Sequence, residues 1–239
     1  MEIGVKTDIG RVRNNNQDAY YVNYPLFIIA DGMGGHKAGE VASSMAIEII
    51  GNDFENNPID LPYEDELIIN RIEDSISKAN REIYHNSIED EDYFGMGTTV
   101  TLAYITEDKI FVGHVGDSRA YIYRQNALSQ ITEDHSLVEE LIKNGSISKE
   151  EAKLHPQRNI ITRAVGTSQQ IDVDITIIAK EKDDILLLCT DGLTNMIDED
   201  EIQKIIMLHE DIQTVCDKLV KLSNDNGGFD NITVMAIKF

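Results

Sequence analysis

Aspartates stand at the ends of apolar runs in this sequence, where side chains are held rigidly enough to do chemistry. Asp31, Asp117 and Asp191 each follow a run typical of a buried strand, and each precedes a glycine or a serine; a fourth, Asp230, opens the last apolar run. A sheet brings strand ends together, and carboxylates crowded in this way need a cation to neutralise them. No Cys or His accompanies them at metal-ligand spacing, so the pattern favours Mg²⁺ or Mn²⁺ over zinc.

A simpler interpretation of each Asp-Gly pair is a tight turn, because this dipeptide is among the commonest in hairpins. Asp31-Gly32, however, precedes Met-Gly-Gly and a predicted helix, and Asp191-Gly192 leads into a segment without strand character. Neither pair therefore closes a two-residue hairpin. The pattern of an EF-hand loop is absent. Taken alone, these residues leave both a metal site and turn chemistry open.

The periodicity of apolar residues predicts the elements that would carry these aspartates. Strands are predicted over 26–30, 98–105, 109–115, 120–123, 171–179, 184–188 and 231–238, and helices over 38–50, 67–84, 137–143, 199–208 and 212–222. The polar stretch 52–66 holds two of the four prolines and predicts a loop between helices. Because strands follow one another in hairpins and helices come in consecutive pairs, the order favours an α+β fold with antiparallel sheets over a βαβ-wound parallel sheet.

Length and composition indicate one globular domain spanning residues 1–239. The chain has 43 acidic and 21 basic residues and a formal charge of −22, which argues against a nucleic acid or a membrane surface as the main partner. Cys189 and Cys216 lie among apolar neighbours and are expected to be buried free thiols in a reducing cytoplasm. We find neither a secretory signal nor an apolar run of the ~18–20 residues needed to span a membrane.

Eight short motifs follow one another in a specific order. They are GRVRNNNQD (10–18), ADGMGGH (30–36), GMGTT (95–99), GDSR (116–119), TEDHS (132–136), HPQRN (155–159), CTDGL (189–193) and DNIT (230–233). Together they resemble the metal-dependent serine/threonine protein phosphatases of type 2C, in their compact bacterial form, over nearly the whole chain. The resemblance implies a central β-sandwich of two antiparallel sheets flanked by pairs of helices, with four αββα layers and a binuclear Mg²⁺ or Mn²⁺ centre at one end.

The resemblance also implies which residues hold two tightly bound ions. Asp31 would bridge both ions, and the carbonyl of Gly32 would bind one of them. Asp191 and Asp230 would bind the other ion. Asp18 would hold water that is bound to the metals. These five residues are the expected core of the centre.

Three further features are carried over from the same family. Asp117 would share a third, weaker ion with Asp191, and Arg13 would grip the phosphate of the substrate. The segment 144–166 would form a flap beside the site. Two ions would cancel the charge of the phosphate dianion and lower the pKa of a bridging water, which attacks phosphorus in line. Catalytic residues are therefore expected to be Arg13, Asp31, Asp191 and Asp230.

Some positions depart from the family pattern or invite a structural interpretation. Gln17 stands where many members have Glu. Met33 stands where animal members carry a histidine proposed as the acid for the leaving alcohol, which leaves His36 as either a proton donor or a loop hydrogen-bonding residue. Other polar residues are expected to be structural: Thr98 and Thr99 satisfying the backbone, Ser118 and Arg119 fixing the turn after Asp117, and His135 capping the helix that follows.

The expected activity is hydrolysis of phosphoserine and phosphothreonine in proteins by a monomeric enzyme. By analogy with the family, its partners would be a Ser/Thr protein kinase and the substrates of that kinase. Two alternatives use the same site differently: a phosphatase for small phosphomonoesters, or one for a regulator in a partner-switching pathway. A third is a non-catalytic module that binds metal or phosphoproteins. It is disfavoured because the metal-binding aspartates are all present.

Overall fold

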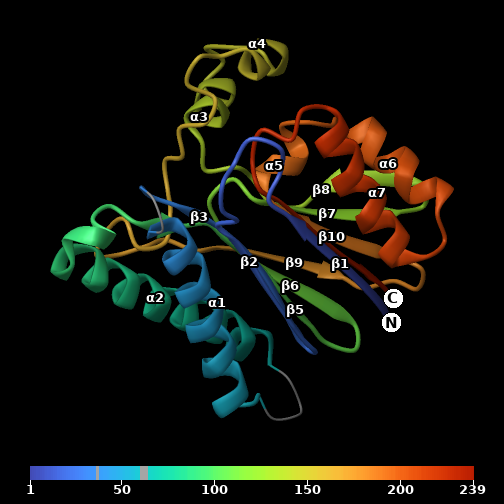
Figure 1. Ribbon diagram of the computed structural model, residues 1–239. Helices are drawn as coiled ribbons and strands as arrows, with labels where there is room; N and C mark the ends of the chain where they lie inside the picture. Colours follow the sequence, from blue (N-terminus) through green and yellow to red (C-terminus); the bar gives the residue numbers. More distant parts are fainter. Residues whose placement is uncertain (36–37, 60–63) are drawn as a thin grey trace.

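Two antiparallel β-sheets, packed face to face between helices, position the aspartates. The computed structural model describes residues 1–35, 38–59 and 64–239 (Figure 1). One sheet has the order β1 (Glu2–Asp8), β11 (Ile232–Lys238), β10 (Ile185–Cys189), β7 (Arg119–Arg124) and β8 (Ala127–Gln130). The other has the order β2 (Asp18–Asn23), β3 (Leu26–Met33), β5 (Val100–Ile105), β6 (Lys109–Val115) and β9 (Asp174–Ala179), and β4 (Gly97–Thr98) pairs with β3.

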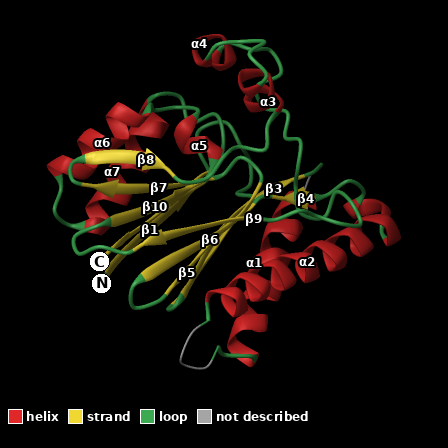
Figure 2. Ribbon diagram, turned by 180° about the vertical axis from the view of Figure 1, so that it is seen from behind, coloured by secondary structure: helices red, strands yellow, loops and turns green. Residues whose placement is uncertain are grey.

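Long helices cover the outer face of each sheet. α1 (Ala38–Asn56) and α2 (Asp65–Glu89) pack on the sheet of β3, and α6 (Glu199–Leu208) and α7 (Ile212–Asp225) pack on the sheet of β10. Of the shorter helices, α5 (Asp191–Thr194) follows β10 and a 3₁₀ turn (Glu91–Tyr93) follows α2. α3 (Leu137–Lys143) and α4 (Lys149–Lys153) project from one end of the sandwich (Figure 2). This arrangement confirms the predicted four-layer α+β sandwich.

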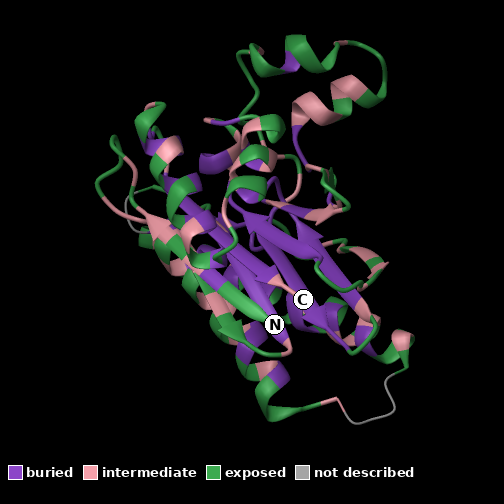
Figure 3. Ribbon diagram, turned by 90° about the vertical axis from the view of Figure 1, so that its right-hand side faces the viewer, coloured by how far each residue is buried: buried purple, intermediate pink, exposed green. Residues whose placement is uncertain are grey.

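Alternation of side chains along the strands builds the apolar layers. In β3, Leu26 and Ile28 pack toward the helices, whereas Phe27 and Ile29 pack between the two sheets. Successive residues of a strand point to opposite faces, so a strand that is covered on both faces is apolar throughout. Such continuous runs are why the central strands could be recognised, and they form the buried centre of the molecule (Figure 3).

The loop predicted over residues 52–66 is wrong at both ends. α1 continues to Asn56 and α2 begins at Asp65, while residues 60–63 of the predicted loop lie outside the described residues. Phe54 accounts for the longer first helix, because its buried ring continues the apolar face of α1 and lies 5.5 Å from the ring of Tyr104. The polar composition of the stretch reflects exposed helix surface as well as loop.

Several elements were not predicted, either because they lie at the edge of a sheet or because they are very short. β1, β2 and β8 are all edge strands of their sheets, so one side of each faces solvent and their sequences are mixed in polarity. α4 and α5 have only five and four residues, which is too short for a helical period to show. β9 begins at Asp174 and not at residue 171 as predicted.

The cysteines are free and buried, as predicted. Burial raises the pKa of both the Cys189 and the Cys216 thiol to about 12, so neither is poised to react as a thiolate. None of the helices in the described part of the chain combines the length and apolar composition needed to cross a membrane.

Candidate functional site

Carboxylates from both sheets meet near one end of the sandwich. The segment of α3 and α4 projects from this end (Figure 1). Asp31 of β3 is paired in register with Asp18 of β2, Asp117 follows β6, and Asp191 opens α5 directly beyond β10. Burial raises the pKa of Asp31 well above its usual range, and the charges of Asp18, Asp191, Asp117 and Asp230 raise it further. The structure therefore brings the five predicted aspartates into electrostatic contact.

Asp18 is held by two threonine hydroxyl groups from the other sheet. Thr190 and Thr233 donate to Oδ2 at 2.9 and 2.7 Å, whereas Oδ1 is buried without a partner. Burial raises the pKa of Asp18 to about 7 despite these hydrogen bonds, and Asp191 and Asp230 add repulsion. One oxygen is thus anchored and the other is left for a ligand.

The backbone of Asp31 is fixed by the two threonines that follow Gly97. Its N–H donates to Thr99 Oγ1 at 2.9 Å, and its carbonyl accepts from Thr98 Oγ1 at 2.9 Å and from the Thr99 N–H at 2.8 Å. The prediction that Thr98 and Thr99 satisfy backbone groups near the site is confirmed. None of these three hydrogen bonds uses the carboxylate of Asp31, which interacts with the other aspartates.

Asp191 shows the same division between its two oxygens. Asn195, one turn later in the chain, donates to Oδ2 at 2.9 Å, and Oδ1 is buried without a partner. Burial and the charge of Asp230 raise the pKa of Asp191 to about 6, while the charge of Arg13 and the hydrogen bond from Asn195 oppose the shift. Asp191 is therefore close enough to both Asp31 and Asp230 to interact with them electrostatically.

Gly32 is confined by α1 and admits no side chain. A Cβ atom there would lie 1.9 Å from the carbonyl oxygen of Gly39. The Gly32 N–H donates to the carbonyl of Gln17 at 3.1 Å, and Ser43 Oγ donates to the same carbonyl at 2.6 Å. The segment of Gln17 is thereby anchored to β3 and α1, and the role of the Gly32 carbonyl as a metal ligand stays a prediction.

Arg13 lies at the open rim of the cluster. Its Nη2 is 2.7 Å from Asp230 Oδ2, and the side chain of Arg13 is 46% exposed. Gly10, with φ of +83°, makes this approach possible, because a Cβ atom there would lie 2.2 Å from the carbonyl oxygen of Asp230. The structure thus brings the predicted phosphate-binding residue beside a predicted metal ligand.

Asp117 lies at the inner end of the site and is only 8% exposed. Its Oδ1 is buried without a partner, and burial together with the charges of Asp191 and Asp134 raises its pKa well above the usual range. Ser118 Oγ is 2.7 Å from Thr99 Oγ1, and Arg119 binds both oxygens of Asp134. The prediction that Ser118 and Arg119 fix this turn is confirmed.

His135 does not cap the following helix, contrary to the prediction. Ser136 is the N-cap of α3 and accepts from the Glu139 N–H. Instead, Nδ1 of the His135 ring accepts from the Gly116 N–H at 3.0 Å. The backbone N–H of His135 donates to the Gly116 carbonyl at 2.8 Å. Since Nδ1 accepts, Nε2 carries the proton and donates to Asp174 Oδ2 at 3.1 Å. His135 is structural, and it holds the residue directly before Asp117.

The oxygen atoms present fit divalent cations that keep part of their water. Asp18, Asp117 and Asp191 each leave one buried oxygen unsatisfied, and such groups are rare without a missing partner. In the described part of the chain, no group of three or more His, Cys, Asp or Glu side chains is arranged so that together they could hold one ion. Mg²⁺ commonly uses only one or two carboxylates and retains water, so open carboxylate pairs suit it.

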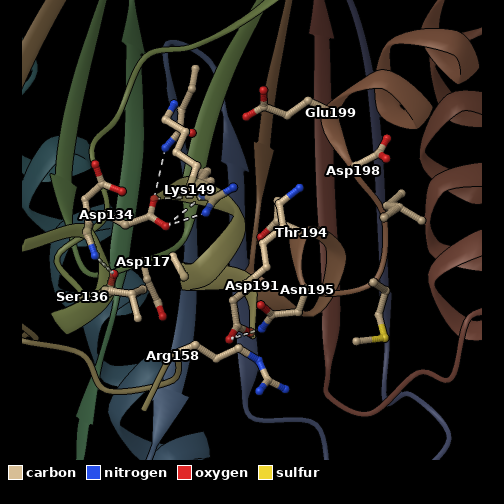
Figure 4. A pocket seen from close by; sticks show the side chains of 18 of the residues that line it. Asp117, Asp134, Ser136, Lys149, Arg158, Asp191, Thr194, Asn195, Asp198 and Glu199 are labelled. Atoms are coloured by element: carbon tan, nitrogen blue, oxygen red, sulfur yellow. Dashed lines mark hydrogen bonds and ion pairs between the residues drawn. The ribbon is translucent and has the colours of Figure 1, made fainter. Parts of the chain in front are cut away.

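A cavity of about 670 Å³ opens beside the aspartates (Figure 4). Asp117 and Asp191 form part of its floor. One wall comes from the projecting segment of α3 and α4, including Lys149 and Arg158, and the other from α5 and the start of α6. The cavity therefore connects the flap region with the carboxylate cluster.

Sequence reasoning missed the residues that orient the aspartates. Thr190, Thr233 and Asn195 were assigned no role, and neither was Asn231, which accepts from the Gln17 N–H at 2.8 Å. Thr190 and Asn231 adjoin predicted ligands in sequence, and this adjacency was the available signal. His36, considered above as a proton donor, lies outside the described residues.

Comparison with known proteins agrees with this geometry. Residues 10–233 match the family model for protein phosphatase 2C. The chain is 40% identical to a serine/threonine phosphatase stp of Listeria monocytogenes over 243 residues, which cover all of this chain and 96% of the relative. It superposes with a TM-score of 0.94 on the crystal structure of the serine/threonine phosphatase Stp1 from Staphylococcus aureus, at 37% identity, covering 100% of this chain and 95% of that one.

A further solved structure holds metal. The catalytic domain of the serine/threonine protein phosphatase PstP, in complex with two manganese ions, has a TM-score of 0.87 and 31% identity, covering 98% of this chain and 96% of that one. The fold, the carboxylate cluster and the near full-length match agree with one another. This chain belongs to the protein phosphatase 2C family.

Proposed function

We propose that this chain hydrolyses phosphoserine and phosphothreonine in proteins, with the five-aspartate cluster as its catalytic centre. The chain is a metal-dependent protein serine/threonine phosphatase. The observation that carries the proposal is the set of unsatisfied, buried oxygens on Asp18, Asp117 and Asp191 beside an exposed arginine. Such a site can hold cations inside and a phosphate at its rim.

Each aspartate has a distinct part in this proposal. Asp31, Asp191 and Asp230, with the carbonyl of Gly32, would hold two Mn²⁺ or Mg²⁺ ions, and Asp18 would hold water beside them. When bound, the ions supply positive charge against the phosphate dianion and lower the pKa of the attacking water. Asp117 and Asp191 would share a third, weaker ion, which would offset the repulsion from Asp191 that, after burial, raises the pKa of Asp117.

Arg13 binds the phosphate. A guanidinium presents two parallel N–H donors that match two phosphate oxygens. Its present contact with Asp230 is an exposed ion pair, a kind of interaction that contributes only about 0–1 kcal/mol. When Asp230 binds a metal ion, Arg13 can therefore release Asp230 and bind an incoming phosphate at little cost in free energy.

The proposal extends to the setting of the enzyme. We propose one catalytic domain over residues 1–239, with the flap at 144–166, acting as a monomer in the cytoplasm opposite a Ser/Thr protein kinase. Two buried free cysteines support a reducing compartment. The match over all of this chain and 96% of a curated relative supports the single domain.

A comparison of substrates tests the proposed activity. The specificity constant kcat/KM is measured with Mn²⁺ for a phosphothreonine peptide, a phosphoserine peptide and small metabolite-like phosphomonoesters. A protein phosphatase should favour the peptides over the small esters. A clear preference for small esters would replace the proposal with a small-molecule phosphatase, and phosphopeptide binding without turnover would indicate a non-catalytic module.

A further inference from the structure

One wall of the cavity beside the aspartates is acidic, whereas the wall formed by the α3–α4 segment carries both signs, because Glu139 and Glu150 line it together with three cations. Four consecutive acids, Asp198 to Glu201, line it from the start of α6, and Lys149, Lys153 and Arg158 line it from the flap (Figure 4). Among the described residues, no ion pair joins the two walls, and none engages any of these three cations. The space between the walls is about 670 Å³, within the range of ligand-binding pockets.

The acidic wall has one structural role that leaves most of its charge unused. Asp198 caps α6 by accepting from the Glu201 N–H at 2.9 Å, and acids in a first helical turn also favour the helix dipole. Capping needs one carboxylate, however. The side chains of Glu199, Asp200 and Glu201 make no ion pair within the described chain, and all three residues line the cavity.

An independent observation connects this cavity with a ligand. Asp117 forms part of the cavity floor, is more than nine-tenths buried, and presents an oxygen without a hydrogen-bond partner. Asp191, also on the floor, presents another. The cavity thus opens directly onto the centre where the phosphate would react. A polypeptide attached to that phosphate must leave the centre along its surface, and this cavity provides a path.

We infer that the cavity binds the polypeptide next to the phosphorylated residue and selects substrates that carry Lys or Arg there. Acidic side chains outnumber basic ones among the lining residues. Basic side chains of the substrate contact Glu199, Asp200 and Glu201, the wall whose charge has a single sign. The inference rests on the proposed function, since it describes how the same site chooses among phosphoproteins.

Paired peptides test this inference. Two phosphothreonine peptides are identical except that Lys residues flanking the phosphothreonine in one are Glu in the other, and kcat/KM is measured with Mn²⁺ at low and high salt. Partly exposed charge pairs each contribute modestly and are screened by salt, so two or three of them give a preference of about tenfold for the basic peptide. Most of it should lie in KM and should shrink at high salt.

Two matched variants locate the preference. The cavity variant combines Glu199→Gln, Asp200→Asn and Glu201→Gln, and the control combines Glu66→Gln, Glu73→Gln and Asp74→Asn on α2, which packs on the other sheet. Both change the net charge equally. The preference should fall to about twofold or less in the cavity variant and persist in the control. Both variants should retain hydrolysis of an activated aryl phosphate, because neither changes the aspartate cluster. The cavity variant also removes acidic side chains from the first turn of α6, so its Tm should fall slightly, and both variants are assayed well below their Tm.

The other outcomes contradict the inference in distinguishable ways. A preference that is absent in the wild type, retained in the cavity variant, or lost equally in both variants would overturn the selection by this wall. In those cases aryl phosphate hydrolysis still proceeds, so the proposed function survives. Absence of any phosphate release with Mn²⁺, from peptides and aryl phosphate alike, would instead overturn the proposed function and this inference with it.

Discussion

Three small polar residues decide which carboxylate oxygens are left for cations. Thr190 and Thr233 bind one oxygen of Asp18, and Asn195 binds one oxygen of Asp191. In both aspartates the second oxygen is buried and unpaired. An anchored carboxylate cannot rotate away from its site, so its free oxygen is fixed in direction before a metal arrives. This preorganisation is what a centre that positions water and phosphate requires.

Removing the charge of a metal-binding carboxylate should nearly abolish turnover. Asp191→Asn and Asp230→Asn keep the shape of the side chain but weaken its hold on a cation, whose charge is worth several kcal/mol in the transition state. Each ~1.4 kcal/mol is a factor of ten in rate, so kcat on a phosphothreonine peptide should fall by at least ~100-fold. Wild-type kcat in either variant at saturating Mn²⁺ would refute these assignments.

Arg13 should act mainly on substrate affinity. Loss of a hydrogen bond to a charged group costs about 1.5–3 kcal/mol, so Arg13→Ala should lower kcat/KM by about 10- to 100-fold, largely through KM. Arg11→Ala is the matched control, because Arg11 is exposed nearby and contacts Gly228 through its backbone N–H. Equal effects of the two substitutions would show that only local positive charge matters.

At the scale of elements, the sequence predicted the central strands but, among the edge strands, only β9, whose start it placed too early. Central strands such as β5 and β6 are continuous apolar runs, whereas the edge strands β1, β2 and β8 have an exposed side and weak patterns. Asp31, Asp117, Asp191 and Asp230 were found because they adjoin central strands. The hydrogen-bond partners of Asp18 could not be found from the sequence, because Thr190 and Thr233 reach Asp18 only when distant segments fold together.

The turn that carries Asp117 is held by His135, so we expect metal binding at Asp117 to depend on His135. His135 binds both backbone groups of Gly116 and reaches Asp174, which also binds Arg163 at 2.6 Å. His135→Ala should weaken the third Mn²⁺ site about tenfold in calorimetry, from the loss of about 1–3 kcal/mol of buried hydrogen bonding, and leave the two tight sites unchanged. His135→Gln retains an acceptor for the Gly116 N–H and should restore part of the affinity.

A double substitution tests whether His135 acts through Asp117. If it does, His135→Ala should reduce kcat in the wild-type background but add little in the Asp117→Ala background, because coupled residues are not additive. Fully additive losses would show that His135 supports activity by a separate route.

For the whole molecule, the buried His114 of β6 makes the free energy of unfolding depend on pH. Burial and the neighbouring His135, with its ring 4.9 Å away, together lower the pKa of His114 to about 3, opposed by the hydrogen bond to the Glu133 carbonyl and by the charge of Asp174. Between about pH 6.5 and 3, His114 is protonated in the unfolded chain but stays neutral in the folded protein. Stability should therefore fall as pH falls through this range, by up to about 1.4 kcal/mol per pH unit.

The comparison of wild type with His114→Gln isolates this contribution. Both proteins are unfolded by urea between pH 4 and 7.5 in EDTA, so the aspartates contribute equally to both. The difference between their free energies of unfolding should be constant above pH 7 and should change with a slope of about one proton below pH 6. A difference that is independent of pH would contradict a neutral, buried His114.

The central claim is that the aspartate cluster works as a metal centre for phosphate ester hydrolysis. The most direct measurement is phosphate release from a phosphothreonine peptide by protein stripped of metal and then supplied with Mn²⁺, Mg²⁺, Ca²⁺ or excess EDTA. The account predicts turnover with Mn²⁺ or Mg²⁺, little with Ca²⁺, whose larger and looser coordination shell positions water poorly, and none with EDTA. Undiminished turnover of the stripped protein in excess EDTA would contradict it.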